Sequence, residues 1–174
     1  MLKLAALAVA AASTASSPAL ESNAPWWEKV TVTIAGDGNP KACEYTTSRD
    51  GGSASACDVA ESDAAMQATA ASDTPGQLTK ITFERRFIPG QAQPERANIE
   101  AGESLLGGQV MALAIDDAGE VQGCKVVARA GSVTPDYGCD EAATEKFEAS
   151  AGDVSVPAEG FMTILVYAHQ ENVA

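Results

Sequence analysis

Two pairs of cysteines with nearly equal spacing constrain the fold of this chain more than any other feature. One pair is Cys43 and Cys57, and the other is Cys124 and Cys139. When residues 30–52 are aligned with residues 111–132, hydrophobic residues fall on hydrophobic residues and Cys43 falls on Cys124. With one residue inserted, Cys57 falls on Cys139. Because the pattern occurs twice, it predicts a small domain that has been duplicated.

Each half of the chain gives the same order of elements: strand, strand, helix, strand. Residues 30–34 alternate between hydrophobic and polar side chains, which is typical of a strand with one buried face. A turn rich in Gly and Asp follows, and a second strand begins at the first cysteine of each pair. A helix begins near the second cysteine, with carboxylates in its first turn. The prediction is an α+β fold of two tandem β-β-α-β units, each an antiparallel sheet covered by one helix.

The same alignment sets the bounds of the later elements. The helices are expected at residues 56–69 and 139–150. The third strands are expected at residues 78–87 and 161–169, with residues from Gly76 aligned on residues from Gly160.

The first 24 residues have the layout of a secretory signal peptide. Lys3 is followed by an apolar run of Ala and Leu and then by small residues, with cleavage expected after Ala15, Ala19 or Ala24. The apolar run is short for a hydrocarbon core of about 30 Å, which disfavours an uncleaved anchor, and no membrane insertion is expected after cleavage. The predicted organisation is a signal peptide (1–24), a first repeat (25–88), a linker (89–108) and a second repeat (109–174). The expected location is the bacterial periplasm or the exterior.

The charge of the chain disfavours two classes of partner. It carries 11 basic and 24 acidic residues, a formal net charge of −13. Nucleic acids and anionic membranes carry the same sign, so neither is an expected partner.

Export also determines how the cysteines are interpreted. An even number of cysteines in an oxidising compartment is typical of disulfides. Four cysteines permit three pairings, and the repeat selects Cys43–Cys57 and Cys124–Cys139. Each bond would close a short loop and contribute about 3 kcal/mol. A redox pair would favour C-x-x-C, and zinc would favour paired short spacings, so no metal and no cofactor are predicted. A free, reactive thiol at a helix N-terminus is the alternative to a disulfide.

The second half resembles a known family. "VMALAIDDAGEVQGCKVVARAG" is followed by "CDEAA" (residues 139–143), by Phe147 and by "GFMTILVYA". This order is similar to the C-terminal domain of TonB-like proteins, in particular to a variant with cysteines in the second strand and before the helix. The first half shares the pattern more weakly, through Cys43, "SACDVA" and "ITFERRF". Ala130 stands where the family usually has Ser, and "FEASAG" lacks the usual Trp-x-Phe-x-Pro character.

The resemblance implies a function. In that family the last strand of the domain pairs, through its edge, with a short segment of an outer-membrane receptor. An envelope protein bound by strand addition is therefore the expected partner. The residues predicted on partner-binding edges are Thr82, Glu84, Arg85 and Arg86 in the first repeat, and Thr163, Leu165 and Tyr167 in the second. The basic pair in "FERRF" would attract an acidic peptide; alternatively, it is a charged edge that resists aggregation.

Other functions are weaker expectations. Energy transduction is not expected, because Trp26 and Trp27 begin the folded part without an extended spacer before them. A structural, envelope-associated protein that forms a homodimer is the main alternative. The single histidine, His169, belongs to no recognisable nucleophile and base set, so the chain is not expected to be an enzyme.

Overall fold

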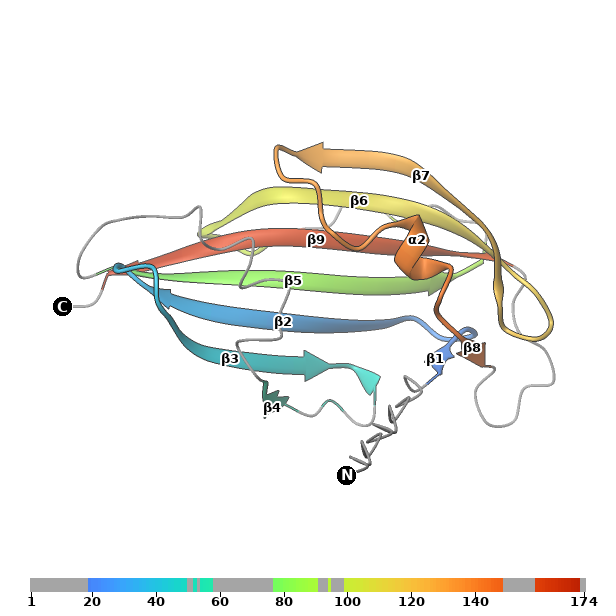
Figure 1. Cartoon of the computed structure of the whole chain (residues 1–174), viewed down its shortest axis with the longest axis horizontal. Coiled ribbons are helices and arrows are strands. Elements are labelled where there is room, and N and C mark those ends of the chain that lie inside the picture. The colour runs from blue at the N-terminus through green and yellow to red at the C-terminus, as the bar shows by residue number, and fades with distance from the viewer. Residues whose placement is uncertain are drawn as a thin grey trace, which may run out of the picture.

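Most of the described part of the chain forms one continuous antiparallel sheet (Figure 1). A computed structural model describes residues 19–49, 52, 54–57, 77–90, 94, 99–148 and 159–172. Its seven strands lie in the order β4-β3-β2-β5-β9-β6-β7. Their bounds are β2 (Trp26–Ala35), β3 (Pro40–Thr47), β4 (Ala54–Ala56), β5 (Gln77–Pro89), β6 (Glu103–Ile115), β7 (Val121–Gly131) and β9 (Glu159–Asn172).

Three short elements pack on one face of this sheet and contribute residues to its core. Strands β1 (Leu20–Glu21) and β8 (Phe147–Glu148) form a separate parallel pair. The helix α2 (Cys139–Ala142) lies beside β7. No helix among the described residues is long and apolar enough to cross a membrane.

The predicted α+β class is wrong, because strands dominate and the observed helix is a single turn. The helix expected at 139–150 ends at Ala142, since the chain must turn to bring Phe147 into the core. Phe147 is buried against Phe87, and β8 pairs with β1. A four-residue helix does not cover a sheet. The helix expected at 56–69 lies, beyond Cys57, outside the described residues.

The predicted duplication is visible in the two hairpins, which share one register. Val32 lies opposite Cys43 in the first hairpin, and Leu113 lies opposite Cys124 in the second. Both hairpins have a register shift just before Ile34 or Ile115. Both turns contain a glycine with φ of 79°, a conformation that L side chains rarely adopt. The repeated sequence pattern therefore encodes a repeated backbone geometry.

The third strands of the two halves, β5 and β9, pair with each other in the middle of the sheet. Their ladder runs from Gln77 opposite Asn172 to Pro89 opposite Gly160. The two halves are related by a pseudo-two-fold axis that passes between Arg85 and Ile164, which are equivalent and lie opposite each other.

This symmetry changes one detail of the sequence alignment. Gly160 is equivalent to Ile81 and not to Gly76, because both lie opposite equivalent residues of β2 and β6. A Cβ atom at Gly160 would lie 2.4 Å from the ring of Phe87, so the ring requires glycine there. Strand β6 also begins at Glu103, inside the predicted linker.

The core lies on the face of the sheet that carries α2, here called the α2 face. Its larger cluster contains the stacked rings of Trp26 and Phe87 together with Phe147. A smaller cluster surrounds Val32 and Ile81. Each disulfide joins one half's second strand to the segment that follows it. The predicted pairs are confirmed: Cys43–Cys57 and Cys124–Cys139, with Cα atoms 5.1 and 5.5 Å apart.

Candidate functional site

The residues predicted to form partner-binding edges lie in the two central strands of the sheet. Strand β5 is paired with β2 on one side and β9 on the other, and β9 is paired with β5 and β6. Their backbone groups are therefore already used in ladders on both sides. The prediction of edge positions is wrong for all seven residues: Thr82, Glu84, Arg85, Arg86, Thr163, Leu165 and Tyr167.

The side chain of Arg85 lies on the α2 face, where it is held by contacts within the protein. Its guanidinium contacts the carboxylates of Glu28 and Glu145 and donates a hydrogen bond to the Tyr137 hydroxyl at 3.2 Å. It also lies 5.4 Å from the ring centre of Trp26 and 5.1 Å from that of Tyr137. Burial opposes the charged form of Arg85, but the carboxylates outweigh it and hold its pKa above the ordinary value. A side chain held this way is not available to a partner.

Arg86 lies on the opposite face, next to a buried carboxylate. The side chain of Glu84 is 2% exposed and contacts Arg86 directly. Glu84 also accepts a hydrogen bond from the Tyr167 hydroxyl at 2.9 Å, and Lys29 lies 3.6 Å away. Burial, together with Glu84, raises the pKa of the Tyr167 phenol. The cluster neutralises a buried charge inside the sheet.

The two true edges of the sheet differ in length and in cover. On one side, β4 is only three residues long, and Cys57 donates its backbone N–H to the Cys43 carbonyl at 3.2 Å. Short strands of this kind blunt an edge. On the other side, β7 spans 11 residues and, within the described residues, has β6 as its only long ladder partner. Among the residues that the structure describes, the only pairing on its outer side is just before its start, where Glu120 bridges to Lys146.

The edge strand β7 has an unusual charge for this chain. Its sequence, VQGCKVVARAG, contains Lys125 and Arg129 and no acidic residue, although the whole chain carries 24 acidic and 11 basic residues. Lys125 and Arg129 are both exposed, and the side chain of Val127 is 40% exposed. The edge therefore offers backbone groups, two positive charges and one apolar side chain to solvent.

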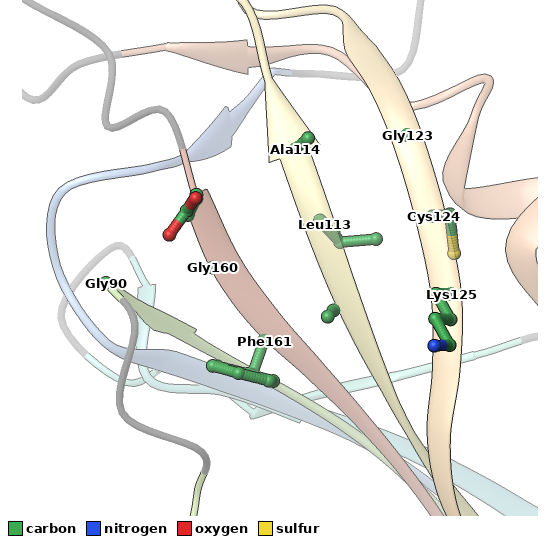
Figure 2. Close-up of a pocket in the computed structure, with 10 residues that line it drawn as sticks. Gly90, Leu113, Ala114, Gly123, Cys124, Lys125, Gly160 and Phe161 are labelled. Carbon is green, nitrogen blue, oxygen red and sulfur yellow. The ribbon is translucent and has the colours of Figure 1, made fainter.

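A hollow of about 630 Å³ lies beside this edge, on the face opposite α2. Figure 2 shows Gly160 and Phe161 on β9, Leu113 and Ala114 on β6, and Gly123 to Lys125 on β7 around it. The register places three of these side chains on one face of the sheet, because Ala112 lies opposite both Phe161 and Lys125. We call this hollow the β7 groove; its full lining is Gly90, Ala112, Leu113, Ala114, Gly123, Cys124, Lys125, Glu159, Gly160 and Phe161.

The β7 groove is open because several of the residues that line it are small. Alanines and glycines occupy neighbouring positions of β6, β7 and β9, which leaves space above the backbone there. The sequence contains one signal of this site, the small residues at 112, 114 and 123. That signal becomes meaningful only when the register places Ala114 opposite Gly123.

Other candidate chemistry is limited. A polar hollow of about 320 Å³ lies over β2, β5 and β9 and includes His169 in its lining. The His169 Nδ1 atom is 3.1 Å from the Gly102 carbonyl oxygen, and Nε2 is 3.8 Å from Glu171. Across the described part of the chain, no group of three or more His, Cys, Asp or Glu side chains is placed to hold a metal ion.

Comparison with known proteins found no match: the chain matches no family model, no curated protein and no solved structure. The TonB-like resemblance therefore stays a prediction that rests on the residues quoted for it.

Proposed function

We propose that this chain is an exported protein-interaction module that binds an extended segment of an envelope protein as an added strand beside β7. The observation that carries the proposal is the 11-residue edge of β7, paired with β6 on one side and bordered by the β7 groove. In strand addition, the backbone edge provides affinity and pockets for alternate side chains provide specificity. Both elements are present on this side of the sheet.

The compartment and the class of partner have separate support. The two disulfides are typical of proteins in oxidising compartments such as the periplasm. The TonB-like resemblance favours a protein partner in the envelope. The binding strand differs from the one that the resemblance implies, because β5 and β9 pair with each other and leave β7 as the long edge. The function that we propose for the module is binding and not energy transduction.

A structural role with self-association is the second candidate. It is favoured by the β5–β9 ladder, because a sheet that joins its own halves is self-contained. Two copies could then pair through β7. That pairing would bring two basic strands together in molecules of net charge −13, and like charges opposed across strands are destabilising. The hetero-partner is therefore our first choice.

Hydrogen exchange of the purified protein tests both candidates. Dodecapeptides selected from a random displayed library serve as probes, because the natural partner is unidentified. In an antiparallel pair the ladder bonds alternate along a strand, so bound peptide should slow exchange at alternate amides of β7 and leave β9 unchanged. A stable homodimer by light scattering, with β7 protected without peptide, would favour self-association. Absence of β7 protection in both experiments would refute strand addition.

A further inference from the structure

We propose that the β7 groove holds one aliphatic or aromatic side chain of the partner strand, two residues away from an acidic residue that pairs with Lys125. This inference rests on the proposed function and specifies the chemistry of its partner. It draws on three observations: the space above Gly123, the position of Lys125, and the charge of β7.

Gly123 leaves room for a side chain of the added strand. In a sheet, a residue placed opposite Gly123 would project on the same face, over the glycine and toward the groove. A Cβ atom at Gly123 would meet only the Cβ of Ala114, at 3.5 Å, which is ordinary contact. Beyond it, Ala112 and Phe161 provide an apolar floor. The space is therefore open, and its surface suits an apolar group.

Lys125 sets the second feature of the partner. It is two residues from Gly123, so its side chain is on the same face, and it also lines the groove. A partner residue opposite Lys125 is consequently two positions from the one that enters the groove. Opposite charges in directly facing cross-strand pairs are favourable, so this residue is acidic. In an antiparallel partner the order is acidic, any, apolar; in a parallel partner it is reversed.

The β7 strand of a second copy does not fit as the occupant. Strand β7 carries Lys125 and Arg129 and no Asp or Glu, so its own sequence has no acidic residue to place opposite Lys125. Charge complementarity therefore selects an acidic segment of another protein.

The test uses synthetic versions of the selected dodecapeptides and measures their Kd by fluorescence anisotropy. Gly123→Val fills the groove with a residue that suits strands and leaves the backbone edge in place. We expect it to weaken binding roughly tenfold or more, the range for a lost apolar contact. Lys125→Glu should weaken binding of the acidic peptides, whereas Lys41→Glu, an equal charge change at an exposed position of β3, should not.

The outcomes separate this inference from the proposed function. Support requires a consensus with an acidic and an apolar residue two positions apart, and loss of binding in Gly123→Val. Peptides that protect β7 amides but lack this pattern, and bind Gly123→Val as tightly as the original chain, would overturn the groove inference only. Peptides that protect no β7 amide would overturn the proposed function. Equal melting temperatures for all variants check that they are folded, and Gly123→Ala provides a milder change if Gly123→Val is unstable.

An independent observation concerns processing at the N-terminus. Leu20 is 2% exposed and belongs to the larger core cluster, and Ser22 is fully buried. The backbone N–H of Leu20 donates to the Lys146 carbonyl at 2.7 Å, and Ser22 bonds to the Glu148 carbonyl through both its N–H and its hydroxyl. Trp26 Nε1 donates to the Glu21 carbonyl at 2.7 Å. Residues 20–22 are therefore part of the folded domain.

We infer that signal cleavage occurs after Ala15 or Ala19 and not after Ala24, because the last site would remove β1 from the fold. Intact mass spectrometry of the protein recovered from the periplasm of a Gram-negative host, expressed with its own N-terminus, tests this. An N-terminus at Ser16 or Leu20 is expected. A mature protein that begins at Pro25, or one that keeps Met1, would overturn the inference.

Discussion

Replacement of Arg85 by alanine should destabilise the protein far more than replacement of Arg129. The Arg85 side chain is 13% exposed and joins four groups from two other parts of the chain: Trp26 and Glu28 on β2, and Tyr137 and Glu145 between β7 and β8. It lies in the interior of β5, beside the pseudo-two-fold axis. Arg129 is an exposed residue of the edge strand.

The magnitude follows from the contacts that are lost. Removing one partner of a buried ion pair leaves carboxylates uncompensated, which costs about 3–5 kcal/mol. Two ring contacts add about 0.5–1 kcal/mol each. Part of the loss is offset, because Glu28 keeps Arg49 at 2.9 Å and the Tyr45 hydroxyl at 3.0 Å. We expect Arg85→Ala to lower the free energy of unfolding by about 3–5 kcal/mol, and Arg129→Ala to change it by less than about 0.5 kcal/mol.

Urea unfolding followed by tryptophan fluorescence measures both values, since Trp26 packs beside Arg85. The midpoint should fall while the slope stays unchanged. Arg85→Lys keeps the charge but loses the planar fork, so it should lie between the two. If Arg85→Ala and Arg129→Ala shift the midpoint equally, the structural role assigned to Arg85 is refuted.

Three further predictions follow from the structure. Gly38→Ala should lower the free energy of unfolding by about 1–2 kcal/mol because Gly38 has a positive φ. Gly119→Ala, at the equivalent position, should lower it by about 3 kcal/mol or more, because a Cβ atom there would lie 1.8 Å from a backbone oxygen. Equal melting temperatures for the two variants would contradict this. Replacing Cys43 and Cys57 together by serine should lower stability by about 3 kcal/mol in urea unfolding, and an unchanged midpoint would show that the bond is not stabilising. Burial raises the pKa of the Tyr137 phenol, so the folded state keeps this proton to a higher pH than the unfolded state does. The free energy of unfolding should therefore fall as the pH rises above about 10. Tyr137→Phe should reduce this fall when the free energy of unfolding is measured between about pH 8 and 11.

Much of the local structure could be predicted from the sequence. Alternation at Val30, Val32 and Ile34 identified the first strand, and the repeat identified both disulfides. These signals are local: alternation follows from burial of one strand face, and the cysteine spacing reports loops of similar length. The helix expected at 139–150 could not be rejected from the sequence, because burial of Phe147 against Phe87 is a contact between distant segments.

The candidate site depended on strand order, which the sequence pattern does not contain. A last strand such as β9 has the same alternation whether it is at an edge or in the centre. Arg85 and Arg86 suggested an exposed edge, yet Arg85 is held by Glu28 of β2 and by residues 137–145, and Arg86 contacts Glu84 of its own strand. The β7 groove likewise requires Ala114 opposite Gly123, a match across two strands.

From the sequence alone came the two disulfides within the halves, the repeated hairpin pattern and its alternating strands, whereas the dominance of strands over helices did not. Only the tertiary structure decided how the halves join. Each half has a third strand with an unpaired edge, and unpaired backbone groups are costly when they are buried. The duplicated chain satisfies both edges at once by pairing β5 with β9. That pairing moved the predicted binding strands to the centre and left β7, with its basic charge and its groove, as the long edge of the described sheet.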